Sequence, residues 1–145
     1  MNIKNLKELI LKKTDELYSF SFALIPDDLQ ASQILIDSIA GFVCKFIENK
    51  PNLNEIELNV KLYKNVFELS KIRYSQLKMT FKDIENTEKF FFLDLNSKAT
   101  IFLNEKTKFS KNEILQILQF SKEEYYSILY LAREKLFSTN ELQEY

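Results

Sequence analysis

Apolar residues recur at helical spacing along the first part of the chain. The first such stretch runs from Leu6 to Leu24 and ends before Pro26; its apolar positions are Leu6, Leu9, Ile10, Leu17, Phe20 and Leu24. Asp27 and Asp28 come next and suit the start of another helix, because carboxylates are stabilised at the positive end of a helix dipole. The pattern therefore predicts one helix on each side of Pro26.

Two further helices are expected at about 29–47 and about 55–77, with a loop around Pro51 between them. The inward positions of the first of these are expected to be Leu29, Ile36, Ile39, Val43 and Phe46. The second carries two neighbouring apolar stripes, formed by Ile56, Val60, Tyr63 and Phe67 and by Leu62, Val66 and Leu69. Two stripes predict a helix that is contacted on two sides, as in a three-helix bundle.

The segment 78–88 is polar and unpatterned, and we interpret it as a linker. The apolar run at 90–92 that follows fits a helix or a strand, because periodicity cannot distinguish the two over so short a stretch. Residues 97–105 then predict a short helix with apolar positions at its centre.

Two capping boxes, Ser110–Glu113 and Ser121–Glu124, follow in the last third of the chain. Their spacing restricts the helix between them to 111–118, which is about two turns. A turn at 119–120 then leads into a longer helix at 122–137. A short helix, a tight turn and a longer helix make the helix-turn-helix arrangement, although an ordinary helical hairpin fits the same pattern.

Composition agrees with a chain made of helices. Among 145 residues there are one glycine and two prolines, too few turn formers for many hairpins. We therefore predict an all-α fold with two small helical bundles joined by a short linker. The first unit would comprise residues 1–77, the linker 78–88, and the second unit, with the helix-turn-helix, 89–145.

The net charge and the residue types of the chain argue against several classes of function. Twenty basic and twenty-one acidic residues give a net charge of −1, whereas a DNA-binding protein usually has a basic excess. The chain has no histidine, one cysteine (Cys44) and no glycine-rich phosphate loop, so we expect no metal, no cofactor and no enzymatic activity. No apolar run approaches the roughly 20 residues of a membrane span, so a cytoplasmic protein is expected.

Three features occur in order within 95–136: a serine followed after two residues by Glu113-Ile114, a serine at 121 that opens the longer helix, and the closing Ala132-Arg133-Glu134-Lys135-Leu136. This stretch resembles region 4 of the extracytoplasmic-function sigma factors of bacteria. The first half resembles region 2 of the same family, at Leu17-Tyr18, Ala31, Gln33, Leu35, Asp37, Phe42 and 61–66.

The resemblance implies a transcription initiation factor that binds core RNA polymerase and directs it to promoter DNA. In that family region 2 binds the polymerase clamp and melts the downstream promoter element, which makes Gln33 and Asp37 candidate polymerase contacts. Region 4 places its second helix in the major groove of the upstream element. The candidate DNA contacts are Lys61, Lys64, Lys71, Arg73, Lys111, Lys122, Glu123, Tyr126 and Arg133.

The recognition helix departs from the family pattern. Gln119 stands where the family usually has glycine, and a reshaped turn is expected because glutamine disfavours a positive φ. Tyr126, Tyr130 and Phe137 form a second apolar edge on the helix, and the segment 111–137 has four basic and four acidic residues. If exposed, such an edge fits a protein-binding or dimer contact better than a DNA-reading surface.

Three interpretations therefore remain open. The first is a working sigma factor that recognises promoters. The second is a sigma-like protein that acts through protein contacts, with polymerase, an anti-sigma factor, another sigma factor or a second copy of itself. The third is a helical interaction module unrelated to sigma factors.

Overall fold

The computed structural model describes residues 3–49, 51–77 and 89–143, and within these ranges the chain is helical and has no strand. The predicted all-α class is thus confirmed. In chain order the elements are α1 (Ile3–Leu24), α2 (Asp28–Asn49), α3 (Glu55–Leu77), the short 3-10 helix η2 (Lys89–Phe92), α4 (Leu95–Lys106), α5 (Lys111–Leu118) and α6 (Lys122–Gln143).

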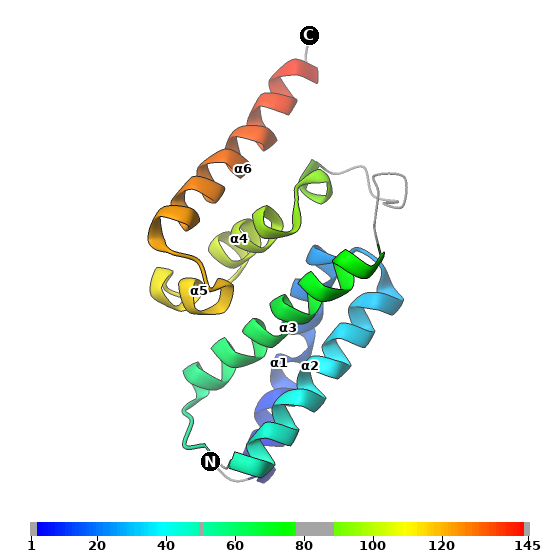
Figure 1. The fold of residues 1–145 in the computed structure, drawn as a ribbon, viewed down its shortest axis with the longest axis vertical. Coiled ribbons are helices and arrows are strands. Elements are labelled where there is room, and N and C mark those ends of the chain that lie inside the picture. The colour runs from blue at the N-terminus through cyan, green and yellow to red at the C-terminus, as the bar shows by residue number, and fades with distance from the viewer. Residues whose placement is uncertain (1–2, 50, 78–88, 144–145) are drawn as a thin grey trace.

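The first three helices pack against one another (Figure 1). α2 begins after Asp27, whose carboxylate accepts a hydrogen bond from the backbone N–H of Gln30 at 3.0 Å. α3 begins after Asn54, whose side-chain oxygen accepts from the N–H of Glu57 at 2.8 Å. Both caps satisfy backbone donors that have no partner inside the helix, and they fix the two helix starts near the predicted positions.

The predicted inward face of α2 is wrong in part. Leu29 and Ile36 are 75% and 59% exposed, whereas the buried positions are Ala31, Ile34, Leu35, Ser38, Phe42 and Phe46. α2 has apolar residues on two sides, and the side that faces both α1 and α3 becomes the buried one. Periodicity identifies the helix but cannot select between two apolar stripes.

α3 is contacted on two sides, as its two stripes predict. Val60, Tyr63, Phe67, Leu62 and Val66 are buried and Leu69 is half-buried, whereas Ile56 is exposed at the first turn. α1 and α2 pack on one side of α3, and α5 packs on another.

The remaining helices begin close to the expected positions. α4 starts two residues earlier than expected, after Asp94, whose carboxylate accepts from the N–H of Ser97 at 2.7 Å. The apolar run at 90–92 is part of a 3-10 helix and not of a strand. α6 extends beyond the predicted end at residue 137, to Gln143.

The N-terminal and C-terminal helices share one hydrophobic core. α4 packs on α1 and α5 packs on α3. Aromatic pairs cross this junction: Phe20 and Phe102 have ring centroids 5.2 Å apart, and Tyr63 and Phe109 are 4.9 Å apart, edge to face. The predicted linker at 78–88 lies outside the described residues.

Among the described helices, none combines the length and the apolar character that crossing a bilayer requires.

Candidate functional site

The start of α5 is built by a capping box, as the sequence predicts. The hydroxyl of Ser110 accepts a hydrogen bond from the N–H of Glu113 at 3.2 Å. In return, the carboxylate of Glu113 accepts from the N–H of Ser110 at 2.7 Å. Two N-terminal donors are satisfied reciprocally, so an eight-residue helix has a defined beginning.

The turn after α5 keeps a left-handed residue without glycine. Gln119 has φ 61° and ψ 36°, and its backbone N–H donates to the carbonyl of Leu115 at 2.8 Å. Its side-chain amide donates to the carbonyl of Gln116 at 2.7 Å, which satisfies a second carbonyl at the end of α5. The expectation of a reshaped turn is therefore wrong: these bonds hold glutamine in the conformation that usually favours glycine.

The turn is anchored to the rest of the protein by Phe120. Its ring lies 6.2 Å from that of Phe67 on α3, edge to face. Immediately afterwards a second capping box starts α6. The hydroxyl of Ser121 accepts a hydrogen bond from the N–H of Glu124 at 3.1 Å, and the carboxylate of Glu124 accepts one from the N–H of Ser121 at 3.3 Å. These contacts fix where α6 begins relative to α3 and α5.

α6 is held against α4 by its inward face. Tyr125, Leu129 and Ala132 are buried, and the hydroxyl of Tyr125 donates to the side-chain oxygen of Asn104 at 3.0 Å. The remaining surface of the helix carries large exposed apolar side chains, with Tyr126, Tyr130 and Phe137 along one edge and Leu131 apart from them. The exposed fractions are 47% for Tyr126, 66% for Tyr130, 52% for Leu131 and 64% for Phe137.

Two candidate DNA contacts near this face already have partners. The ammonium of Lys111 donates to the hydroxyl of Tyr126 at 3.2 Å and lies 5.4 Å from the centre of its ring. The guanidinium of Arg133 is 3.8 Å from a carboxylate oxygen of Glu105 on α4. Both cations are therefore partly neutralised or covered, which weakens any contact they make with phosphate.

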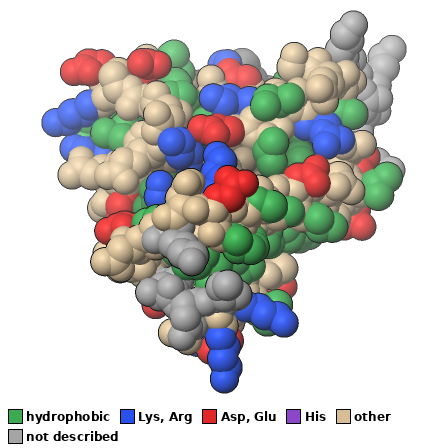
Figure 2. All heavy atoms as spheres, turned by 60° about the horizontal axis from the view of Figure 1, so that its bottom comes forward, with side chains coloured by type: hydrophobic (Ala, Val, Ile, Leu, Met, Phe, Trp, Pro, Cys, Tyr) green, Lys and Arg blue, Asp and Glu red, His purple; other side chains and the backbone are tan. Residues whose placement is uncertain are grey.

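Lys122 and Glu123 are the other candidates on α6, and both are exposed in its first turn. Their opposite charges leave this helix end without a basic excess. On the face drawn in Figure 2, basic and acidic side chains are interspersed and do not separate into fields of one sign.

The candidate DNA contacts on α3 do not form one strip. Lys61 is exposed and Lys64 is half-buried, while the ammonium of Lys71 lies 4.8 Å from the ring centre of Phe67. Arg73 belongs to a different side of the helix, since its guanidinium lies 3.7 Å from Asp37 and donates to the side-chain oxygen of Gln30 on α2 at 3.2 Å. α4 and α5 lie between α3 and α6 (Figure 1), so the two sets of candidates are separate.

The two candidate polymerase contacts do lie together. The side-chain amide of Gln33 donates to the carboxylate of Asp37 at 2.9 Å, one turn further along α2, and both residues are exposed. Asp37 also pairs with Arg73, which sequence reasoning assigned to DNA. A polar cluster of Gln33, Asp37 and Arg73 thus spans the surface of α2 and α3.

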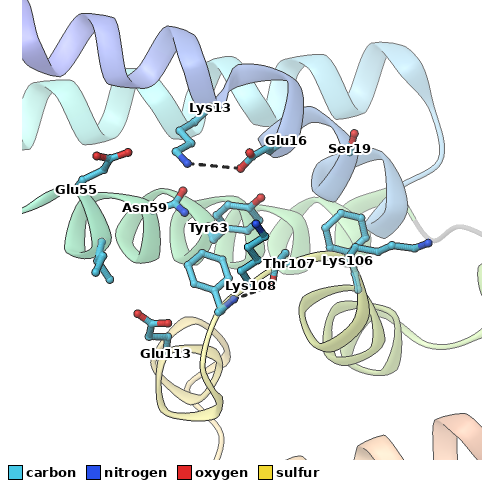
Figure 3. A pocket seen from close by; sticks show the side chains of 13 residues that line it. Lys13, Glu16, Ser19, Glu55, Asn59, Tyr63, Lys106, Thr107, Lys108 and Glu113 are labelled. Carbon is cyan, nitrogen blue, oxygen red and sulfur yellow. Dashed lines mark hydrogen bonds and ion pairs between the residues drawn. The ribbon is translucent and has the colours of Figure 1, made fainter.

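The structure also contains a cleft that sequence reasoning missed. It has a volume of about 830 Å³ and lies between α1, α3 and the α4–α5 connection (Figure 3). Its walls carry three lysines and three glutamates, namely Lys13, Lys106, Lys108, Glu16, Glu55 and Glu113. Lys13 and Glu16 pair at 3.9 Å, and burial together with the charge and hydrogen bond of Glu16 raises the pKa of Tyr63.

Lys98 is a second feature that the sequence pattern did not reveal. Its side chain is 2% exposed, and its ammonium donates to the carbonyl oxygen of Leu24 at 2.6 Å. Burial lowers the pKa of Lys98 to about 8, against the opposing effect of the nearby Asp94 carboxylate. A lysine in a helix is normally read as solvated, so nothing in the local pattern marks it as buried.

The described residues offer little for metal or thiol chemistry. In the part of the chain that the structure describes, no group of three or more histidine, cysteine, aspartate or glutamate side chains is placed to hold a metal ion. Cys44 is a free, exposed thiol.

Comparisons with protein-family models, with curated proteins and with solved structures found no match for this chain.

Proposed function

We propose that this protein is a sigma-like transcription regulator that binds core RNA polymerase and uses the exposed face of α6 to contact protein rather than promoter DNA. The proposal combines the sequence resemblance to sigma regions 2 and 4 with the chemistry of α6. Such a protein works in the cytoplasm, where core polymerase is found.

One observation favours protein over DNA as the partner of α6. The outward side of α6 presents Tyr126, Tyr130 and Phe137, while Arg133 beside them pairs with Glu105. Reading base edges in the major groove requires aimed hydrogen-bond donors and acceptors, and phosphate contacts require available Lys and Arg. Exposed aromatic side chains with a paired arginine instead match the composition of protein interfaces, where Tyr, Phe and Arg are enriched.

The polymerase contact is proposed for the cluster of Gln33, Asp37 and Arg73. These side chains are joined by a hydrogen bond and an ion pair, so they present a preorganised polar surface on α2 and α3. Preorganised groups lose little side-chain entropy on binding.

Promoter recognition is the second candidate, and the backbone at α5 and α6 favours it. Two capping boxes and the left-handed Gln119 maintain a short helix, a tight turn and a longer helix, which is the order of elements in helix-turn-helix DNA-binding motifs. Lys122 is exposed in the first turn of α6, the part of a recognition helix that meets base edges.

The proposal is tested by capture of the purified full chain on immobilised core RNA polymerase. We expect the wild-type chain to be retained and Asp37→Lys to lose at least about tenfold in affinity, because it reverses the charge at the centre of the cluster. Glu48→Lys is the matched control: it reverses an exposed charge near the C-terminal end of α2, away from the cluster, and should bind like the wild type. Equal binding of the two variants, or no capture of the wild type, contradicts the polymerase contact.

A further inference from the structure

The exposed residues of α6 follow the spacing of a coiled-coil seam. Tyr126, Tyr130, Arg133 and Phe137 are separated by four, three and four residues. This alternation is the heptad pattern of two positions that face a partner helix. The three aromatic side chains are 47–66% exposed and the side chain of Arg133 is 45% exposed, so the whole seam is accessible.

The packing of α6 on the rest of the protein leaves these seam residues exposed to solvent. Tyr125, Leu129 and Ala132 are the buried residues that hold α6 on α4, and they form a stripe about a quarter turn away from the seam. In Figure 1 α6 lies at the edge of the molecule, with one long side away from the other helices. Two seam side chains also touch the protein's own helices, Tyr126 through Lys111 of α5 and Arg133 through Glu105 of α4, so a partner helix would approach along the part of the seam that these contacts leave exposed.

We propose that the seam pairs with the same seam of a second copy of this chain, antiparallel and about a twofold axis. In this register Tyr126 of one copy meets Phe137 of the other, and Tyr130 meets Arg133. Each contact occurs twice by symmetry, giving aromatic pairs at the ends and cation–π pairs at the centre. The assignment rests on the proposed function, in which this face of α6 contacts protein.

Charge favours the antiparallel arrangement. In a parallel pair Arg133 would stand at the same level as its own copy, and like charges in contact destabilise an interface. In the antiparallel pair each guanidinium lies over an aromatic ring, and Glu105 of its own chain stays 3.8 Å away to balance the charge. Lys111 contacts Tyr126 and restricts that side chain before association.

The available area fits a weak, reversible dimer. From exposed fractions of 47–66%, the three aromatic side chains would bury on the order of 700 Å² over two copies, given 150–250 Å² for each aromatic side chain. This is less than the roughly 1,200 Å² at the lower end of specific interfaces, so we expect a weak dimer that forms as the protein concentration rises.

Sedimentation velocity over a concentration series tests the dimer. The wild-type chain should shift from monomer to dimer as its concentration rises. Tyr130→Lys should weaken self-association by about 100-fold, because each dimer loses two central contacts and places a like charge against each Arg133. Leu131→Lys is the matched control: Leu131 is 52% exposed on the same helix but off the seam, so this variant should associate like the wild type.

The register is tested by cross-linking in a Cys44→Ser background, which removes the native exposed thiol. Tyr126→Cys and Phe137→Cys variants, mixed, should be joined by a short bis-maleimide. Either variant alone should react poorly, because eleven residues of helix separate the two positions by about 16 Å. Strong cross-linking of each variant with itself would indicate a parallel pair and overturn the assigned register.

The outcomes separate this inference from the proposed function. A chain that stays monomeric at every concentration but still binds core polymerase refutes the dimer and leaves the polymerase contact standing. A chain that dimerises through Tyr130 but does not bind polymerase supports the dimer and contradicts the polymerase contact. Equal dimerisation of the Tyr130→Lys and Leu131→Lys variants also refutes the seam as the interface.

Discussion

The ammonium of Lys98 lies 2.6 Å from the carbonyl oxygen of Leu24 and joins α4 to the C-terminal end of α1. The last carbonyls of a helix lack partners within the helix and carry the negative end of its dipole, so a lysine there is favourably placed. The cost is burial of a charged group, which lowers the pKa of Lys98 to about 8.

This burial predicts an unusual dependence of stability on pH. The pKa of Lys98 falls from 10.5 to about 8 on folding, so between these values the unfolded chain holds a proton that the folded chain has lost. The free energy of unfolding should then rise by roughly 1 kcal/mol per pH unit as the pH increases above 8. Above pH 10 the raised pKa of Tyr63 acts in the opposite direction, because the unfolded chain then releases its phenolic proton first.

Urea denaturation at several values between pH 7 and pH 10 measures this slope. Lys98→Met removes the titrating group, so the variant should be flat over the range in which the wild type gains stability. Equal slopes for the two proteins would show that Lys98 keeps its ordinary pKa in the folded state.

The left-handed conformation of Gln119 predicts opposite effects for two substitutions. Glycine has no Cβ to strain at φ 61°, so Gln119→Gly should stabilise the protein by about 0.5–1 kcal/mol, even though it loses the bond to Gln116. Gln119→Val should destabilise it by about 1–2 kcal/mol, because a β-branched residue is a poor fit in this region. Thermal unfolding followed by circular dichroism measures both changes in stability. A destabilised Gln119→Gly variant would mean that the hydrogen bond from the Gln119 side chain to Gln116 contributes more to stability than the backbone strain costs.

The buried face of α2 predicts which apolar residues matter for stability. Ile34 is 1% exposed, so Ile34→Ala should cost about 2–5 kcal/mol through lost burial and a cavity. Leu29 is 75% exposed, so Leu29→Ala should change stability by less than about 0.5 kcal/mol. Chemical denaturation measures both changes in the free energy of unfolding. A larger loss for Leu29→Ala than for Ile34→Ala would instead support the inward face expected from periodicity.

The shared core predicts that N-terminal and C-terminal helices unfold together. Phe20 on α1 is fully buried and lies 5.2 Å from Phe102 on α4, and Phe20→Ala should cost about 3–5 kcal/mol. Hydrogen exchange should show the same loss of protection in α3 and in α5, because these helices pack on each other. A loss of protection that is confined to α1, α2 and α3 would show that the N-terminal and C-terminal helices form two independently stable units.

Local signals in the sequence predicted the elements well. Each capping box needs only a serine and a glutamate three residues apart, so the starts of α5 and α6 could be identified without any tertiary information. The turn at Gln119 was harder, because its left-handed geometry depends on bonds to Leu115 and Gln116 that residue type alone does not reveal.

Contacts between helices could not be predicted in the same way. The pairing of Arg73 with Asp37 depends on how α3 lies beside α2, and it moves Arg73 away from the other candidate DNA contacts. The burial of Lys98 depends on the end of α1 reaching α4. The exposed aromatic edge of α6 was predictable, because the inward stripe of Tyr125, Leu129 and Ala132 fixes which side faces solvent.

The choice between protein and DNA at α6 is tested most directly by the salt dependence of DNA binding. Fluorescence anisotropy of the full chain with a labelled duplex, from low to physiological salt, gives a slope that reports the number of phosphates contacted. We predict weak binding, a shallow slope of about one or two phosphates, and no change of affinity for Tyr130→Glu. Tight binding with a slope of several phosphates that Lys122→Ala reduces would contradict a protein contact at α6 and favour promoter recognition.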